Sequence, residues 1–234
     1  MINQTAFPRF TVLTGNYGSG KTELALNLAL RFAAEGLKTT LVDLDIVNPY
    51  FRSAEKTPEL EAAGVRVLMP TFAMTTVDIP ALPPEIQSVF ETPGDRVIFD
   101  VGGDETGAAA LGRYAPGFAR YRAETLSLLV VNCMRPLTET EEDILDLAGR
   151  IGARGRLGTD WIVNNTNLAN RTESAMVERG ERILLSCAEK LHASKVITSG
   201  MPPVLAACRL KTETLGIVRR MIPEWMEEET DGEP

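Results

Sequence analysis

Eight residues near the N-terminus have the types and the spacing of a loop that binds phosphate groups. The stretch GNYGSGKT fits the pattern G-x-x-x-x-G-K-[ST], and an apolar, β-branched run precedes it. Its glycines permit tight bends that turn backbone N–H groups inward, toward phosphate oxygens. We expect Lys21 to reach the β- and γ-phosphates of a nucleotide and the Thr22 hydroxyl to bind Mg²⁺. The expected phosphate-binding residues are Gly15, Asn16, Tyr17, Gly18, Ser19, Gly20, Lys21 and Thr22.

A carboxylate that ends a later apolar run would complete a metal site beside this loop. The run RVIFD, residues 96–100, continues as DVGG, which matches D-x-x-G. We expect Asp100 to help bind Mg²⁺ and the backbone N–H of Gly103 to contact a γ-phosphate, a contact that is lost on hydrolysis. Motor and AAA ATPases usually carry Glu after this aspartate, whereas Val101 stands here. The sequence therefore favours the kinase and GTPase half of the P-loop proteins.

Two further carboxylates follow another apolar run, in LVDLDIVNPYFRS, residues 41–53. Asp43 and Asp45 lie at the carboxyl end of the predicted strand, and open α/β sheets bind their ligands at that edge. Acidic residues at a strand end also form turns, so their position alone leaves both roles open. In a chain that already carries a phosphate loop, we expect both carboxylates to belong to the site.

Short apolar runs alternate with helical stretches along the chain. The expected strands are residues 10–14, 39–45, 65–69, 96–100, 125–132, 160–165 and 195–199. The expected helices are residues 23–35, closed by Gly36, residues 84–91, a helix opened by a capping box at Thr138 and Glu141, and residues 173–191. Continuous apolar strands between helices predict an α/β fold: a single P-loop NTPase domain whose mostly parallel central sheet has helices on both faces.

The composition bounds the domain count and the class of function. The 234 residues suffice for one α/β domain, with a core of about residues 9–222 and a frayed acidic tail of about residues 226–234. A net charge of −8 argues against nucleic-acid binding, because no surplus of basic side chains exists to release counterions. Three widely spaced cysteines indicate thiols in a reducing compartment, and no run resembles a membrane span or a signal peptide. We expect a cytoplasmic protein that binds neither nucleic acid nor membrane.

The order of these motifs resembles that of a known family. GNYGSGKT, an apolar strand ending in D-x-D, and DVGG together resemble the MinD/ParA/CobQ-type nucleotide-binding proteins of the SIMIBI class, over about residues 10–203. The resemblance implies that Asp43 helps to hold the waters around Mg²⁺ and that Asp45 orients the attacking water. DLDIVNPYFR is also similar to a switch segment of uncharacterised bacterial ATP-binding proteins in that family.

One residue departs from the family pattern. Many MinD/ParA members have Lys directly after the first loop glycine, where it reaches the phosphates of a partner subunit, but this chain has Asn16. An amide supplies no positive charge, so we expect no strictly ATP-dependent sandwich dimer, although a homodimer through another face stays possible. Arg52 or Arg135 are alternative sources of the charge, and a structural role for either is the competing interpretation.

The base is expected to contact the loop after the sixth predicted strand. Guanine selectivity in such proteins usually comes from N-K-x-D, whose Asp accepts two hydrogen bonds from guanine. This chain has Asn164, Asn165, Thr166 and Asn167, and an unmatched amide donor at the last position would cost about 1–3 kcal/mol. The amide carbonyl of Asn164 or Asn165 is instead expected to accept adenine's amino group, with the turn Met201-Pro202-Pro203, and Pro202 in particular, over the ring. We predict ATP rather than GTP; a plain polar turn is the alternative.

Three functions remain open, of which the first is favoured. It is a switch ATPase whose Mg²⁺-dependent ATP binding and slow hydrolysis act on an unidentified protein partner, for maturation, loading or positioning. The second is a ligase or kinase of the dethiobiotin-synthetase/CobQ type, which phosphorylates a small-molecule substrate. The third is a nucleotide-binding module without hydrolysis. A complete amidotransferase needs a further domain and a catalytic histidine, and the single histidine, His192, lies near a helix end.

Overall fold

The computed structural model describes residues 2, 4–45, 53–69, 84–92, 94–103 and 105–221. Arg52 and the switch-like residues 46–52 lie outside the described residues, and so does the predicted acidic tail at 226–234. The loop from Gly15 to Thr22, the candidate metal carboxylates Asp43 and Asp100, and the candidate catalytic carboxylate Asp45 all lie inside them.

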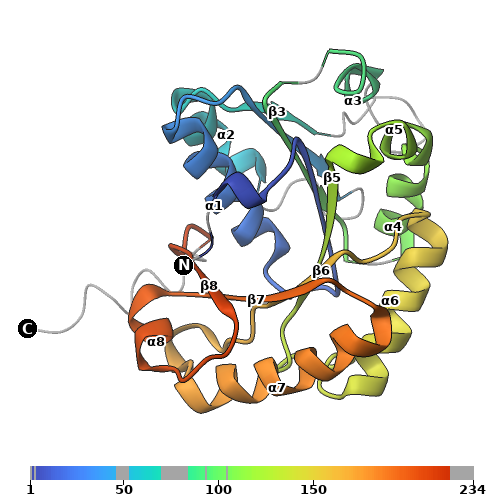
Figure 1. Ribbon diagram of the computed structural model, residues 1–234. Helices are drawn as coiled ribbons and strands as arrows, with labels where there is room; N and C mark the ends of the chain where they lie inside the picture. The colour runs from blue at the N-terminus through green and yellow to red at the C-terminus, as the bar shows by residue number, and fades with distance from the viewer. Residues whose placement is uncertain are drawn as a thin grey trace, which may run out of the picture.

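Eight described strands form one sheet, and every neighbouring pair in it is parallel (Figure 1). They are β1 (Phe10–Thr14), β2 (Thr39–Leu44), β3 (Arg66–Leu68), β4 (Arg96–Val101), β5 (Thr125–Val131), β6 (Trp161–Asn164), β7 (Lys195–Gly200) and β8 (Glu213–Gly216). Their order is β3-β2-β4-β1-β5-β6-β7-β8. Because the strands are parallel, the loops that follow them gather at one edge of the sheet.

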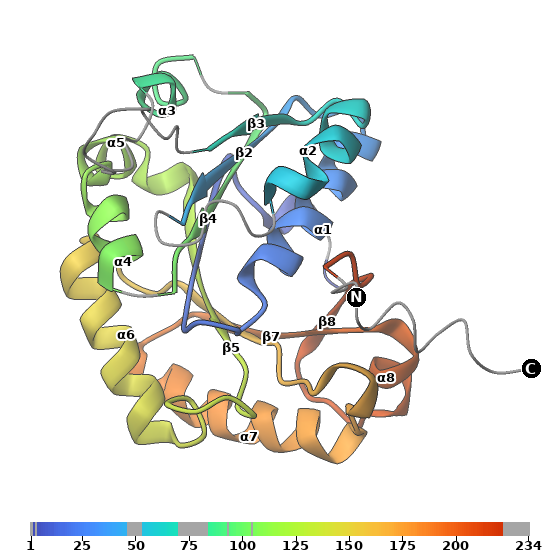
Figure 2. The same cartoon turned by 180° about the vertical axis from the view of Figure 1, so that it is seen from behind.

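Helices cover both faces of this sheet. They are α1 (Lys21–Ala34), α2 (Ser53–Ala62), α3 (Pro84–Ser88), α4 (Glu105–Gly112), α5 (Ala115–Arg120), α6 (Glu141–Gly155), α7 (Ser174–Leu191) and α8 (Pro202–Ala207). Figures 1 and 2, drawn from opposite sides, show α1 and α2 on one face and α4, α5, α6 and α7 on the other. The predicted α/β fold, with a parallel sheet covered on both faces, is confirmed.

The helix that follows the phosphate loop forms the centre of one core layer. Leu24, Leu28 and Phe32 recur on one side of α1 at helical spacing, and all three are fully buried against strand residues such as Ile98 and Leu128. Gly36 ends the helix in the left-handed conformation, with φ 81°, as predicted. The core thus fixes the start of α1, and with it the phosphate loop, relative to β1.

The opposite layer consists of an aromatic cluster and an aliphatic one. Phe90 lies at the centre of the aromatic cluster, with its ring centroid 5.3 Å from that of Phe10 and 5.1 Å from that of Phe118. The aliphatic cluster joins α6 and α7 to β5 and β6, through residues such as Ile144 and Leu184. These contacts hold β4 and β5 on either side of β1, so the loops after the three strands keep their relative positions.

The capping box of α6 differs from the prediction. Thr140, and not Thr138, caps the helix: its side chain accepts a hydrogen bond from the Asp143 backbone, and the Asp143 carboxylate accepts one from the Thr140 N–H. The Thr138 hydroxyl is buried and donates to the backbone carbonyl of Asn132, 2.9 Å away. Acidic residues occupy both positions three residues after these threonines, so the sequence pattern alone fits two registers.

Candidate functional site

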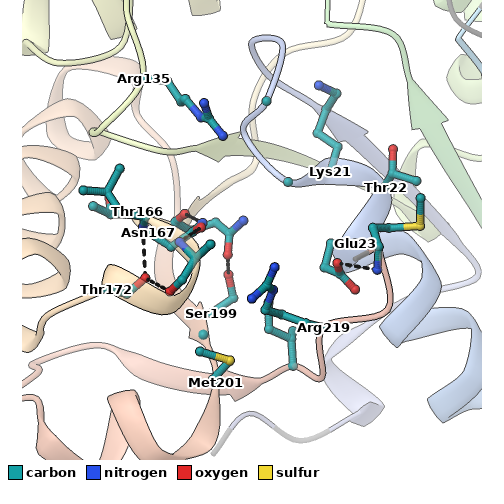
Figure 3. A pocket seen from close by; sticks show the side chains of 18 of the residues that line it. Lys21, Thr22, Glu23, Arg135, Thr166, Asn167, Thr172, Ser199, Met201 and Arg219 are labelled. Carbon is teal, nitrogen blue, oxygen red and sulfur yellow. Dashed lines mark hydrogen bonds between the residues drawn. The ribbon is translucent and has the colours of Figure 1, made fainter. Parts of the chain in front are cut away.

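A cavity of about 540 Å³ opens at the carboxyl edge of the sheet. The phosphate loop, the end of β2 and the end of β4 line one half, and the segments after β6, β7 and β8 line the other. Figure 3 shows this arrangement, with Lys21 and Thr22 on one side and Thr166, Asn167, Ser199 and Met201 on the other. The volume suits a nucleotide-sized ligand.

Glycines shape the phosphate loop where no other residue fits. Gly15, Gly18 and Gly20 have φ values of 143°, 71° and 88°, which L side chains rarely adopt. A Cβ atom on Gly20 would lie 2.2 Å from Nδ2 of Asn165, so the loop also needs glycine there for space. Lys21 is buried, and its ammonium group donates to the backbone carbonyl of Asn16 across the loop, 2.9 Å away. The loop is therefore closed around its own lysine.

Three carboxylates stand at the phosphate end of the cavity. Asp43 and Asp100 occupy paired positions on β2 and β4, and only 5% and 3% of their surfaces are exposed. Asp45 lines the same cavity, and its backbone N–H donates to Oδ1 of Asp43 at 2.8 Å. Burial, and then the charge of Asp43, raise the pKa of Asp100 to about 7, although Lys21 and the Thr22 hydroxyl act in the opposite direction. The negative charges of the neighbouring carboxylates thus act on one another at this end of the cavity.

These donors fit Mg²⁺. Oδ1 of Asp100 is buried and has no hydrogen-bond partner among the described atoms, while the Thr22 hydroxyl bonds to the same carboxylate. Mg²⁺ prefers hard oxygen ligands and usually keeps several waters, so it binds through one or two protein groups together with phosphate oxygens. No three His, Cys, Asp or Glu side chains among the described residues converge to hold a metal alone. Thr22, Asp43 and Asp100 are therefore suited to a metal that a nucleotide brings with it.

The DVGG segment touches the phosphate loop through its backbone. A Cβ atom on Gly103 would lie 2.5 Å from the backbone nitrogen of Tyr17, and one on Gly102 would lie 3.2 Å from Oδ1 of Asp45. Gly107, at the start of α4, packs against Gly102 equally closely. A shift of this segment would therefore reach the phosphate loop, Asp45 and α4 together.

At the far end of the cavity, the predicted base contacts divide into two groups. Asn164 is fully buried and does not line the cavity; its Nδ2 donates to the Val177 carbonyl and its Oδ1 accepts from the Thr166 N–H. The prediction that Asn164 binds adenine is therefore corrected, because its side chain is outside the cavity lining and bonds to α7 and to the turn. Asn165 does line the cavity, and both ends of its amide are bonded as well: Nδ2 donates to the Ser19 carbonyl at 2.7 Å, and Oδ1 accepts from the Ser199 hydroxyl at 2.9 Å.

Pro202 does not line the cavity either. It opens α8, whereas its neighbour Met201 and the next turn of the helix, at Val204, face the cavity. Of the predicted turn Met201-Pro202-Pro203, Met201 is therefore the residue that lines the cavity. The predicted contacts of the phosphate loop and of Gly103 with nucleotide phosphates stay predictions.

A segment that the sequence did not single out completes the cavity wall. Residues 217–221 follow β8, and Ile217, Arg219 and Met221 line the base half. Glu23 binds this segment through its carboxylate, which accepts from the backbone N–H groups of residues 220 and 221 at 2.7 and 3.1 Å. Asn27 pairs with the backbone of Val218 in both directions, at 2.8 and 2.9 Å. The helix α1, which begins in the phosphate loop, therefore fixes this wall of the cavity directly.

Solved structures with the same fold include the cell division protein FtsY from Thermotoga maritima, which has 20% sequence identity and a TM-score of 0.52 over 82% of this chain and 62% of that chain. The 54 kDa signal recognition particle protein from Aeropyrum pernix, in complex with GDP, has 20% identity and a TM-score of 0.50, over 82% and 41%. Chloroplast FtsY from Physcomitrella patens has 19% identity and a TM-score of 0.50, over 76% and 56%.

The chain spans less than two thirds of the length of each of these proteins. No protein-family model and no curated protein sequence matches it. No helix among the described residues is long and apolar enough to cross a membrane. The structural likeness shows the fold alone: the chain has the fold of the SIMIBI class of P-loop NTPases.

Proposed function

We propose that this protein binds ATP with Mg²⁺ and hydrolyses it slowly, as a switch that acts on a protein partner. The observation that carries the proposal is one cavity with two unlike ends. A glycine-shaped phosphate loop and three carboxylates stand at one end, and an asparagine-rich turn with an apolar wall stands at the other. The narrower MinD/ParA/CobQ assignment and a cytoplasmic location belong to the same proposal.

The lining of the base half supports adenine over guanine. Guanine offers adjacent N–H donors that a carboxylate accepts best. Glu23, Asp43, Asp45 and Asp100 are the acidic residues among the described lining, and three of these stand at the phosphate end. Glu23 uses both of its oxygens to hold residues 220 and 221. The half of the described lining away from the phosphate loop therefore offers guanine no carboxylate that is not already bonded to the chain. Asn167, at the position of the guanine-binding Asp, carries an amide, and its Nδ2 donates to the Asn165 carbonyl at 2.7 Å.

Mg²⁺ would be held by Thr22 and the phosphates, with Asp43 and Asp100 binding its waters, and it would supply positive charge to the transferring phosphoryl group. Lys21 would leave the carbonyl of Asn16 for the phosphates. Thr22 interacts with Asp100, so Asp100 is assigned to the metal. Asp45 lines the same cavity and is left for the role of orienting a water. The backbone of Gly103 would report the state of the phosphates to Tyr17, whose side chain is 65% exposed and open to a partner.

Titration of the purified protein with ATP and with GTP, each with Mg²⁺, tests the proposal. ATP should bind at least about fivefold more tightly than GTP. The N–H donors of guanine would be buried without an acceptor, and an unmatched buried donor costs about 1–3 kcal/mol. Lys21→Ala should abolish binding and turnover, whereas Lys38→Ala, which changes an exposed lysine remote from the cavity, should leave both unchanged. GTP binding as tight as that of ATP would overturn the choice of base, and an unaltered Lys21→Ala would overturn the site.

A further inference from the structure

The loop between β5 and α6 is held rigidly beside the phosphate loop. Within it, the N–H of Arg135 donates to the Asn132 carbonyl at 3.1 Å, and the Thr138 hydroxyl donates to the Arg135 carbonyl at 3.1 Å. The N–H of Cys133 donates to the Thr166 hydroxyl at 3.2 Å, and the Thr140 cap fixes the far end. Arg135 therefore projects from a loop that is bonded at both ends.

A direct tether joins this loop to the phosphate loop. Nδ2 of Asn16 donates to the backbone carbonyl of Pro136 at 3.0 Å, and Oδ1 of Asn16 accepts from the N–H of Tyr17 at 2.8 Å. Asn16 thus occupies the position where many members of the resembled family carry a lysine, but both ends of its amide bond to this chain's own backbone. Its role is to hold the Arg135 loop in place.

The guanidinium of Arg135 lies over the middle of the phosphate loop. The position of a Cβ atom on Gly18 would be 3.3 Å from Nε and 3.5 Å from Cζ of Arg135. Arg135 lines the cavity, and no hydrogen bond or ion pair of its guanidinium is found among the described residues. Figure 3 shows Arg135 at the upper left and Lys21 at the upper right, and Met201 and Arg219 lie lower in the view. The guanidinium of Arg135 therefore lies beside the phosphate loop and forms no ion pair with the part of the chain that the structure describes.

Backbone strain in the same loop fits this placement. Leu137 has a φ of 65°, in the left-handed region that favours glycine. Its side chain is 68% exposed, so burial of the side chain does not explain this backbone conformation. Residues other than glycine are uncommon in the left-handed region, and such strain persists where the surroundings impose it. The tether of Asn16 to the preceding residue, Pro136, and the Thr138 bonds impose it here.

We propose that Arg135 binds the phosphate chain of the nucleotide in cis and supplies the charge that Asn16 lacks. This inference rests on the proposed ATP site and adds a specificity residue to it. A guanidinium presents a planar set of donors that bonds two phosphate oxygens at once, which an ammonium group does not do. With that charge supplied by the same chain, the phosphate site is complete within one subunit.

Equilibrium titration of Arg135→Gln with ATP, ADP and adenosine tests the proposal. ATP affinity should fall about 10- to 100-fold, since hydrogen bonds to charged groups are the strong ones, while adenosine affinity should not change. Arg135→Lys should recover only part of the loss. Arg150→Gln, which removes an exposed arginine that pairs with Asp146 on α6, is the matched control and should bind ATP as the parent protein does.

Asn16→Ala separates the tether from the charge, because it frees the loop but keeps the guanidinium. It should weaken ATP binding less than Arg135→Gln does, and the double variant should be no weaker than Arg135→Gln alone. ATP binding by Arg135→Gln that stays within about twofold of the parent, while Lys21→Ala loses binding, would overturn the role of Arg135 and leave the ATP site standing. An equal loss of adenosine binding would also overturn it, and a parent protein that binds no nucleotide would overturn both.

Discussion

Asp100 is buried beside a like charge, and this makes its protonation depend on what else occupies the site. Burial and Asp43 raise its pKa to about 7, against the opposing effects of Lys21 and Thr22. A carboxyl group with this pKa is about half protonated at neutral pH, and a cation that bound beside it would displace the proton. Protons and a bound Mg²⁺ would therefore compete for the same oxygen atoms.

The nucleotide-free protein should lose stability as the pH rises through about 7 because of this one group. Below about pH 4 the carboxyl is protonated in both the folded and the unfolded chain, and between about pH 4 and pH 7 the folded chain alone keeps the proton. The stability that the proton contributes is therefore present at low pH and is lost through pH 7. Chemical unfolding of the parent and of Asp100→Asn should show this decline in the parent only. Parallel curves would contradict the raised pKa.

Asp45→Asn should bind ATP about as tightly as the parent and hydrolyse it about 10²- to 10⁴-fold more slowly. The amide keeps the size of the side chain beside Gly102, but it cannot accept a proton from water or orient it as a carboxylate does. Single-turnover hydrolysis with a separate binding titration distinguishes the two effects. Unchanged turnover would transfer the water-orienting role to another residue.

At the scale of elements, the buried strands were predictable and the small peripheral elements were not. β1, β4 and β5 read as continuous apolar runs because both sheet faces bury them. β8 (ETLG) was not predicted because Leu215 is its only fully buried residue. A four-residue edge strand is too short to show an alternation of apolar and polar side chains. α4 (ETGAAALG) contains two glycines, which lower helix propensity, and tertiary packing against β4 and α6 stabilises it instead.

The closeness of DVGG to the phosphate loop can be tested with two matched substitutions. Gly103→Ala should weaken ATP binding and lower stability, because its methyl group would lie 2.5 Å from the backbone nitrogen of Tyr17. Gly149→Ala, in the middle of α6 with no atom within 4 Å of the new methyl group, should instead raise stability by about 0.5–1 kcal/mol. Thermal unfolding with and without ATP measures both. A Gly103→Ala protein that behaves like Gly149→Ala would show that the contact gives way freely.

At the scale of the whole molecule, the residues predicted for the phosphate end lie together at one end of the cavity, whereas much of the opposite wall was not singled out from the sequence. The phosphate loop has residue types that only a few arrangements employ, in one continuous stretch. The opposite wall includes Arg219 and Met221, ordinary residues that line the cavity because of where β8 ends. Asn164 looked like a ligand because it is polar at a strand end, but burial commits its amide to the turn. Tertiary contacts, and not local pattern, decide such cases.

Asn27→Ala should loosen the base wall without touching the phosphate loop. It removes the paired contacts to the Val218 backbone, each worth about 1 kcal/mol, so ATP affinity should fall by up to about tenfold. Binding of inorganic tripolyphosphate, which has no base, should stay unchanged. Isothermal titration of both ligands gives the comparison. Equal weakening of the two would mean that the substitution disturbs the start of α1 instead.

The bonds from Glu23 and Asn27 to the segment after β8 join residues that are 191 to 198 positions apart in the chain. A ribosome therefore releases the phosphate loop long before it releases the wall that encloses the base. The 57 residues from Asn165 to Met221 take about 3 to 11 seconds to synthesise. Until they emerge, a nascent chain has a phosphate loop but no enclosed site. A nucleotide that needs the enclosed cavity would then stabilise only chains that have been made at least as far as Met221, because a ligand stabilises the state that binds it.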